Sequence, residues 1–267
     1  MATRGPRLAK IQEGAGARMQ LQGKVAIITG ASRGIGKGIA TVMAREGAAV
    51  AIAARSETEG RIPGTIYATA EKINAEGGKA LAVRCDVSQE EDVRGMVERT
   101  LEAFGRIDVL VNNAGGSFTY EKVETYPIRR FDRLLSVNVR GVFLCCQAVL
   151  PTMIAQKSGS IITISSAAAS AFRYPGDSIY GLSKAAVERF AMGLATEVRE
   201  HNISVVVVQP GAVKTEGALV VYPPDHDWTG WQEPEEVGPA IVWLARQDAA
   251  SFTMRVVRST DFGTVWP

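Results

Sequence analysis

The amino-acid sequence predicts an α/β fold in which a doubly wound parallel sheet of about seven strands carries helices on both faces. Short β-rich runs alternate with helical patterns from Leu21 onward, and several of these runs are apolar throughout. Apolar strands of this kind are typical of a sheet that is covered on both faces. Strand–helix alternation favours parallel strands joined by right-handed crossovers. No internal repeat or linker divides the chain, so we expect one domain over residues 21–267.

The seven predicted strands cover residues 24–28, 49–53, 80–84, 108–111, 160–164, 203–208 and 255–258. The clearest helical pattern follows Ser88, which forms a predicted capping box with Glu91. One helical face then carries Val93, Met96, Val97, Leu101 and Phe104. Gly105 stands where this helix should end, because glycine is the commonest residue after a helix C-terminus.

The composition predicts a large buried core. The chain has 267 residues, of which 46% are hydrophobic and 22% charged, with 27 glycines, and such a composition excludes a disordered chain. No stretch approaches the ~18 consecutive apolar residues that a membrane-spanning helix needs. The three cysteines, Cys85, Cys145 and Cys146, lack metal-ligand spacing. They predict reduced thiols in a cytoplasmic protein without a metal site.

The formal net charge of +2 comes from the N-terminal segment. Residues 1–20 carry four basic side chains and one acidic side chain, so the rest of the chain has no basic excess that would favour nucleic acid or an anionic membrane as partner. The segment lacks the apolar core of a secretory signal. We expect a disordered basic extension, with an organelle-targeting signal as the alternative.

A glycine-rich turn follows the first predicted strand. Residues 29–36 read Thr-Gly-Ala-Ser-Arg-Gly-Ile-Gly and precede a helical pattern over 37–46. Glycines at such a turn let the backbone approach a pyrophosphate, whose charge is met by the helix N-terminus. A plain tight connection is the alternative, but the position after the first strand favours dinucleotide binding.

The end of the second predicted strand indicates which dinucleotide. A chain that binds NAD usually offers a carboxylate there to the ribose hydroxyls, whereas this chain has Arg55, with Arg33 inside the glycine turn. Arginine binds a phosphate through forked, charge-assisted hydrogen bonds. The sequence therefore predicts NADP(H) in preference to NAD(H), unless both arginines are ordinary surface charges.

A serine, a tyrosine and a lysine predict the reactive centre. Ser166 follows the strand 160–164, and the four-residue spacing of Tyr180 and Lys184 places them one turn apart on a helix face. A free tyrosine has a pKa of about 10, and a nearby ammonium lowers this pKa towards the pH at which enzymes work. These residues predict a general acid/base that acts on a substrate oxygen.

Together these motifs resemble the short-chain dehydrogenase/reductase family from about Leu21 to the C-terminus. Further matching segments are Asp86-Val87, Val111-Asn112-Asn113-Ala114-Gly115, Val137-Asn138-Val139 and Pro210-Gly211-Ala212-Val213-Lys214-Thr215. Residues 62–67 resemble an insertion in hydroxysteroid-dehydrogenase-like proteins. The resemblance implies a Rossmann-like fold and an NADP(H)-dependent oxidoreductase that interconverts a carbonyl and a secondary alcohol without a metal.

The resemblance also implies residue roles. Tyr180 exchanges a proton with the substrate oxygen, Lys184 lowers the tyrosine pKa and binds the nicotinamide ribose, and Ser166 rather than Ser165 hydrogen-bonds the substrate. Asn138 holds a water that links Lys184 to solvent. The expected cofactor-binding residues are Gly30, Ser32, Arg33, Gly34, Ile35, Gly36, Arg55, Asp86, Val87, Asn113, Ala114, Gly115, Tyr180, Lys184, Pro210, Gly211, Val213 and Thr215.

Substrate specificity is expected in loops at the carboxyl ends of the strands. Phe118, Phe172, Tyr174, Leu219 and Trp228 predict an apolar substrate pocket, with packing on the protein itself or on a neighbouring subunit as an equal alternative. For His226 a solvated loop histidine is favoured over a substrate contact. We expect a homodimer or homotetramer acting on a small carbonyl or alcohol.

Several functions stay open at this point. Outside the enzymes, a catalytically silent cofactor-binding regulatory protein is the alternative. Within the enzymes, the alternatives are a 3-oxoacyl thioester reductase and a steroid or sugar-alcohol dehydrogenase.

Overall fold

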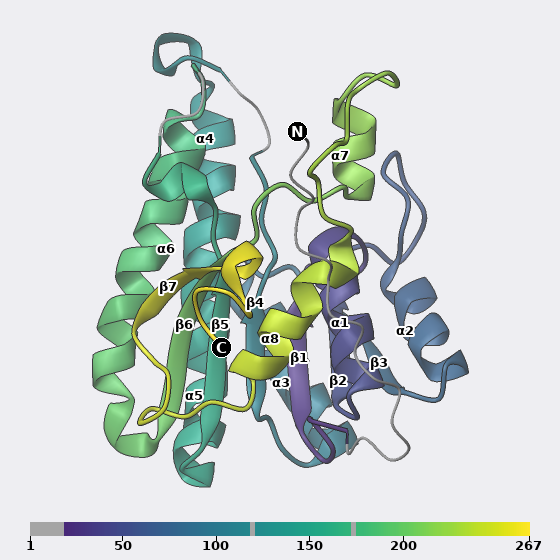
Figure 1. Cartoon of the computed structure of the whole chain (residues 1–267), viewed down its shortest axis with the longest axis vertical. Helices are drawn as coiled ribbons and strands as arrows, with labels where there is room; N and C mark the ends of the chain where they lie inside the picture. Colours follow the sequence, from purple (N-terminus) through teal and green to yellow (C-terminus); the bar gives the residue numbers. More distant parts are fainter. Residues whose placement is uncertain (1–18, 118–120, 172–174) are drawn as a thin grey trace, which may run out of the picture.

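The computed structural model describes residues 19–117, 121–171 and 175–267. The predicted seven-stranded parallel sheet is confirmed, in the order β3-β2-β1-β4-β5-β6-β7 (Figure 1). The strands are β1 Val25–Thr29, β2 Ala49–Ala54, β3 Lys79–Arg84, β4 Val109–Asn112, β5 Gly159–Ile164, β6 Ile203–Gln209 and β7 Arg255–Arg258. Each lies within one residue of its predicted range, because most of these short runs are largely apolar and are bounded by turn residues in the sequence itself.

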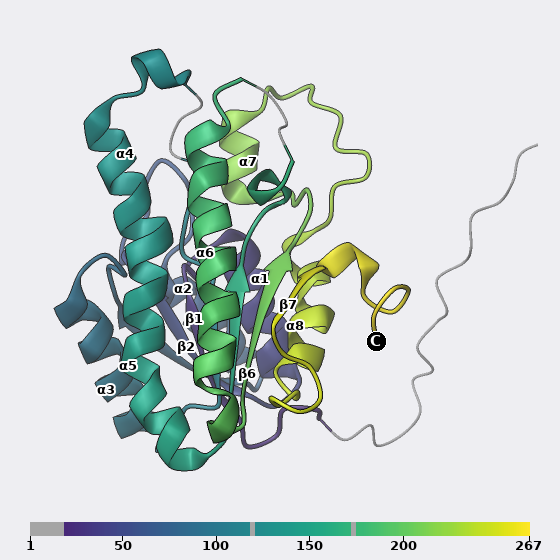
Figure 2. The same ribbon diagram turned by 90° about the vertical axis from the view of Figure 1, so that its left-hand side faces the viewer.

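Eight α-helices connect the strands in the part of the chain that the structure describes. They are α1 Gly34–Arg45, α2 Ile66–Ala75, α3 Glu90–Phe104, α4 Ile128–Leu135, α5 Gly141–Gln156, α6 Ser178–Glu197, α7 Glu216–Val221 and α8 Gly238–Leu244. One hydrophobic core joins α1, α2 and α8 to one face of the sheet, and a second joins α3, α5 and α6 to the other. Figure 2 shows α5 and α6 on the opposite side of the strands from α1 and α8.

Sequence order along the sheet reverses between β1 and β4, which are hydrogen-bonded neighbours. In open α/β sheets, ligands bind outside the carboxyl ends of the strands at this switch point. The fold therefore brings the segments that follow β1 and β4 to one place. It also brings the ends of β5 and β6 close by.

The helix α3 differs from its prediction at the N-terminus. It begins at Glu90, and the side chain of its N-cap residue, Gln89, makes no capping hydrogen bond. The predicted capping box at Ser88 is wrong, because the helix begins one residue too late for Ser88 to be its N-cap. The Ser88 hydroxyl donates instead to Asp86 Oδ1 at 2.8 Å. Gly105 ends the helix with φ of 75°, as expected, and Val93, Met96 and Val97 are buried.

One long helical stretch combines α4, a π-helical turn Ser136–Arg140 and α5. Over Ile128–Gln156 it is long and apolar enough to cross a membrane, but half of its most apolar window is buried within the fold. Insertions of one residue that form a π turn are often found at functional sites. Here the turn carries Asn138.

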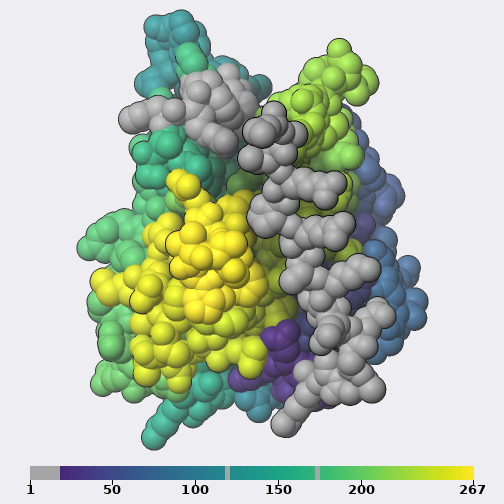
Figure 3. Space-filling view, viewed as in Figure 1, coloured from purple at the N-terminus to yellow at the C-terminus, as the bar shows by residue number. Residues whose placement is uncertain are grey.

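The two ends of the described chain pack on the domain. Leu21 is fully buried, whereas residues 1–18 of the expected extension lie outside the described residues. At the other end, Trp266 contacts Trp243, Phe252 and Phe262. Figure 3 shows the C-terminal residues, in yellow, gathered on one face.

Candidate active site

The turn after β1 and the loop after β4 are tied together by hydrogen bonds. Thr29 Oγ1 accepts from the backbone N–H groups of Asn113 and Ala114, each at 3.0 Å. The Asn113 side chain donates to the Thr29 carbonyl at 2.8 Å. Sequence reasoning did not identify Thr29, although it directly precedes the first glycine of the turn.

The glycines of the turn make room for this loop. Gly30 has φ of 67°, in the left-handed region, and a Cβ there would lie 2.9 Å from Ala114 Cα. A Cβ at Gly36 would lie 2.4 Å from Asn113 Nδ2 and 2.6 Å from the Gly30 carbonyl oxygen. The glycines are therefore required by the protein's own packing, in addition to any ligand. Within the same turn, the Ser32 side chain is buried and the Ile35 side chain packs on the hydrophobic core.

The N-terminus of α1 binds an anionic group from a distant part of the chain. The Gly34 N–H donates to Glu216 Oε2 at 2.7 Å, and Lys37 Nζ lies 3.7 Å from Glu216 Oε1. A helix N-terminus with free N–H groups attracts negative charge. The bound carboxylate shows that the N-terminus of α1 can accept an anion. The turn therefore fits the pyrophosphate of a dinucleotide.

Both arginines predicted to contact a 2′-phosphate lie at the carboxyl end of β2. Arg33 Nη2 donates to the Gly64 carbonyl at 2.6 Å and to Ser56 Oγ at 3.1 Å. Arg55 Nη1 lies 3.5 Å from Asp86, and its side chain is 48% exposed. Gly64, in the connection between β2 and α2, thus helps to orient Arg33.

Asp86, which lies beside Arg55, and Val87 follow the end of β3. Burial opposes ionisation of Asp86, but hydrogen bonds from Ser88 and the charge of Arg55 outweigh it and hold the pKa of the carboxyl below its ordinary value. Val87 is buried against Gly141, where a Cβ would lie 2.8 Å from Val87 Cγ2.

Tyr180 and Lys184 share one face of α6, as predicted. Lys184 Nζ lies 5.7 Å from the centre of the Tyr180 ring and donates to the Ile164 carbonyl at 2.8 Å. The lysine side chain is only 7% exposed. Burial lowers the pKa of Lys184 to about 8, and Glu188 on the next turn partly opposes this effect.

Of the two serines after β5, Ser165 is hydrogen-bonded within the protein. It is buried and its hydroxyl donates to Glu188 Oε1 at 2.7 Å. Ser166 is half-buried, and its Oγ accepts from Ala168 N at 3.2 Å. The geometry favours Ser166 as the serine available to a substrate.

Asn138 is buried at the centre of this group. Its Nδ2 donates to the Gly116 carbonyl and to Ser183 Oγ, both at 3.0 Å, and its Oδ1 accepts from Gly116 N. A Cβ at Gly115 would lie 3.0 Å from Asn138 Oδ1 and 3.7 Å from Lys184 Nζ. The asparagine side chain therefore joins the loop after β4 to α6, next to the lysine.

A further carboxylate, Glu188, was missed by sequence reasoning. Its Oε1 accepts from Ser165 and also from Gln209 Nε2 at 2.9 Å. These contacts hold α6 against the ends of β5 and β6. A glutamate four residues after Lys184 is a signal in the sequence, but its partners lie 21 and 23 residues away along the chain.

The segment from Pro210 to Thr215 passes beside the glycine turn. The Pro210 carbonyl accepts from Gln232 Nε2 at 2.6 Å, Gly211 has φ of 78°, and Val213 is buried. Thr215 caps α7 through Ala218 N, and a Cβ at Gly34 would lie 3.2 Å from Thr215 Cγ2.

Residues 216–233, the lid segment, hold an aromatic cluster of Tyr222, His226, Trp228 and Trp231. The His226 ring lies 4.3 Å from Tyr222 and 4.6 Å from Trp228, between ring centroids. The expected solvated loop histidine is thus wrong, because His226 is half-buried among rings.

The predicted substrate-lining residues are only partly described. Trp228 packs within its own segment, whereas Leu219 on α7 is 52% exposed. Phe118, Phe172 and Tyr174 lie outside the described residues.

The burial of Lys184 predicts a pH dependence of catalysis. With a pKa of about 8, the ammonium dominates below that pH and is lost as the pH rises through it, so the Tyr180 phenolate loses its neighbouring cation. We expect kcat/KM to fall above about pH 8, measured between about pH 6 and pH 10. In Lys184→Arg, whose cation does not titrate in this range, the fall should move to higher pH. Superimposable profiles would contradict this role of the lysine.

Comparisons with known proteins identify the family of the chain. The sequence profile of the short chain dehydrogenases matches residues 24–221. The 3-oxoacyl-[acyl-carrier-protein] reductase of Synechocystis sp. is 35% identical over 255 residues, which are 92% of this chain, and the match covers 98% of that protein.

Two solved structures share the fold. A metagenomic short-chain oxidoreductase in complex with NADP has a TM-score of 0.75 at 33% identity, covering 90% of this chain and 98% of the other. A 7α-hydroxysteroid dehydrogenase complexed with NADH and 7-oxo glycochenodeoxycholic acid has a TM-score of 0.79 at 29% identity, covering 90% of this chain and 94% of the other. The chain belongs to the short-chain dehydrogenase/reductase family, as an oxidoreductase that acts on CH-OH donors with a nicotinamide cofactor.

Proposed function

We propose that this oxidoreductase uses NADP(H) to interconvert a carbonyl and a secondary alcohol, with Tyr180 as the general acid/base. The observation that carries the proposal is the buried Lys184 ammonium, 5.7 Å from the Tyr180 ring, at the end of the sheet where the glycine turn lies. A cation at this distance stabilises the phenolate form of a tyrosine. It therefore makes the phenol a usable proton carrier.

A bound nicotinamide supplies or accepts hydride at its C4 carbon. During reduction, the Tyr180 hydroxyl gives its proton to the substrate oxygen, and during oxidation the phenolate takes that proton back. Ser166 hydrogen-bonds the same oxygen as charge develops on it. Asn138 keeps α6 and the loop after β4 in register through Ser183 and Gly116, so that Lys184 stays beside the phenol.

The proposed preference for NADP(H) rests on Arg33 and Arg55. The related structures include both an NADP complex and an NADH complex, so the preference is argued from this chain's own residues. In this chain β2 is followed by Arg55 where NAD-binding proteins usually have a carboxylate. Arg33, held by Gly64 and Ser56, adds a second cation beside it.

The lid segment favours a small carbonyl substrate over one carried by an acidic protein. It contains Glu216, Asp225, Asp227 and Glu233, and neither lysine nor arginine. An acidic rim repels an acidic carrier protein. The proposal is therefore a free ketone or secondary alcohol with an apolar body.

A panel of ketones and secondary alcohols tests the proposal. Turnover is followed by nicotinamide absorbance at 340 nm, with NADPH or NADP and with NADH or NAD. We expect turnover of at least one class, with the higher kcat/KM in the presence of the phosphorylated cofactor. Cofactor binding without turnover across the panel would contradict the proposed enzyme and favour a regulatory protein.

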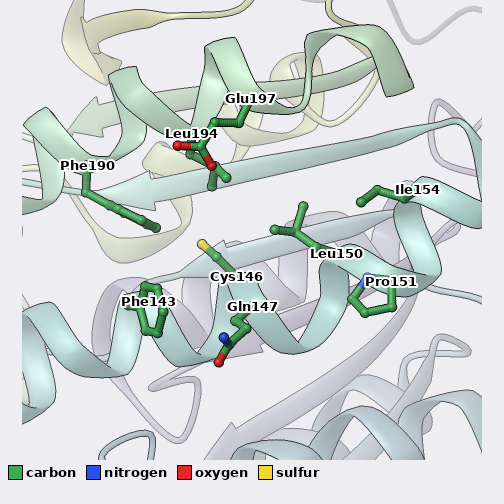
Figure 4. Close-up of a pocket in the computed structure, with 9 residues that line it drawn as sticks. All are labelled: Phe143, Cys146, Gln147, Leu150, Pro151, Ile154, Phe190, Leu194 and Glu197. Carbon is green, nitrogen blue, oxygen red and sulfur yellow. The ribbon is translucent and has the colours of Figure 1, made fainter.

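We also propose that the protein is a cytoplasmic homodimer or homotetramer. An apolar groove between α5 and α6, lined by Phe143, Leu150, Ile154 and Phe190, supports an interface between subunits (Figure 4). Phe143 is 45% exposed and Ile154 is 36% exposed, and such apolar side chains gathered on one surface favour burial against a partner.

A further inference from the structure

We propose that Glu216 sets the affinity of the free enzyme for its dinucleotide, because its carboxylate lies where the pyrophosphate must bind. The inference rests on the proposed binding of a nicotinamide dinucleotide at the glycine turn. It adds a residue of the lid segment that competes with the cofactor.

The contact joins segments that are 182 residues apart in the chain. Glu216 Oε2 accepts the Gly34 N–H at 2.7 Å, and Lys37 Nζ lies 3.7 Å from the other carboxylate oxygen. The first turn of α1 has no acidic residue of its own, and Arg33 at its N-terminus makes no capping hydrogen bond. Glu216 therefore supplies the negative charge that the end of α1 attracts.

The local structure explains why the carboxylate reaches this position. Thr215 caps α7, so Glu216 is the first residue of that helix. A Cβ at Gly34 would lie 3.2 Å from Thr215 Cγ2, which places the starts of α1 and α7 in contact. The N-terminus of α1 carries partial positive charge, and the Glu216 carboxylate that accepts the Gly34 N–H stabilises it.

A pyrophosphate bound at the glycine turn needs the same N–H groups. Two anions at one helix N-terminus repel each other, so the Glu216 side chain must leave Gly34 when the dinucleotide binds. Part of the binding free energy is spent on breaking its contacts with Gly34 and Lys37. Glu216 begins α7, which carries Leu219 and leads to the aromatic cluster. When Glu216 leaves Gly34, the lid segment therefore loses one of its contacts with α1.

Dissociation constants of Glu216→Gln test the proposal. The substitution keeps the side-chain size and removes the charge, so we expect the Kd of both NADPH and NADH to decrease by roughly three- to thirty-fold. Both ligands should respond alike, because both contain the pyrophosphate. Kd is measured by calorimetric titration without substrate, so that catalysis does not enter.

Asp225→Asn is the matched control. Asp225 is exposed in the same lid segment, so this variant removes the same charge without touching α1. We expect its Kd values to stay within about two-fold of the wild type, as is usual for screened surface charges.

Thermal unfolding separates competition from a general loss of stability. Without cofactor, Glu216→Gln should unfold at a lower temperature than the wild type, because α1 loses its anionic partner. With saturating NADPH the variant should gain more stability than the wild type does, since tighter binding raises the apparent stability further.

The outcomes distinguish this inference from the proposed function. Unchanged or weaker binding of both dinucleotides to Glu216→Gln, with a wild type that binds them, would overturn the inference alone. A decrease in Kd of the same size in Asp225→Asn would also overturn it, because a long-range charge effect would then be sufficient. A wild type that binds neither dinucleotide would overturn the proposed function and this inference with it.

Discussion

Replacing Tyr180 with phenylalanine is expected to lower kcat by roughly 10²- to 10⁴-fold, the usual contribution of a general acid or base. The substitution removes the hydroxyl that we propose as the proton donor to the substrate oxygen, and it keeps the ring beside Lys184. The Kd of NADPH should change little, because the glycine turn and the 210–215 segment are untouched. The measurements are steady-state reduction of the best ketone of the panel and calorimetric titration of NADPH.

Tyr67→Phe is the control for this variant. Tyr67 is 47% exposed on α2, and its hydroxyl donates to Glu57, so the same chemical change is made away from the site. Its kcat should equal that of the wild type. Wild-type turnover by Tyr180→Phe, or an equal loss in both variants, would contradict the assignment of Tyr180.

Replacing Arg55 with aspartate is expected to reverse the cofactor preference. The change removes the proposed charge-assisted partner of a 2′-phosphate and supplies a carboxylate to the ribose hydroxyls of NAD. A hydrogen bond to a charged group contributes about 1.5–3 kcal/mol, so the ratio of kcat/KM for NADPH over NADH should decrease by roughly 10- to 100-fold. The ratio is measured from initial rates at subsaturating cofactor with one fixed ketone.

Arg61→Asp gives the same change of charge in the same connection, where Arg61 is exposed. The ratio for this control should stay within about two-fold of the wild type. An unchanged ratio in Arg55→Asp, or a wild type that prefers NADH, would show that Arg55 does not recognise the 2′-phosphate.

The sheet could be predicted from the sequence because its signals are local. Most strands are short, largely apolar runs bounded by turn residues, and the alternation with helices leaves few possible topologies. The pairing of Tyr180 with Lys184 is also a local consequence of helical spacing. For the same reason, Gly105 could be assigned as the end of α3.

Contacts between distant segments could not be predicted in this way. The carboxylate of Glu216 accepts a hydrogen bond from Gly34, 182 residues away in the chain. Glu188 accepts hydrogen bonds from Ser165 and Gln209, which lie at the ends of two strands. The prediction of a capping box at Ser88 was wrong because α3 begins at Glu90, which makes Gln89 rather than Ser88 the N-cap residue. His226 was misjudged because three aromatic side chains of its own segment enclose it.

Transfer of deuterium tests the central claim most directly. The wild type and Tyr180→Phe are incubated with the best ketone of the panel and with NADPH labelled at C4 on either face, and the alcohol is analysed by mass spectrometry. The account predicts that NADPH labelled on one face, and not on the other, places one deuterium on the carbinol carbon of the alcohol. The wild type should form this labelled alcohol much faster than Tyr180→Phe does. Unlabelled alcohol from both labelled forms, or labelling at equal rates by both proteins, would contradict it.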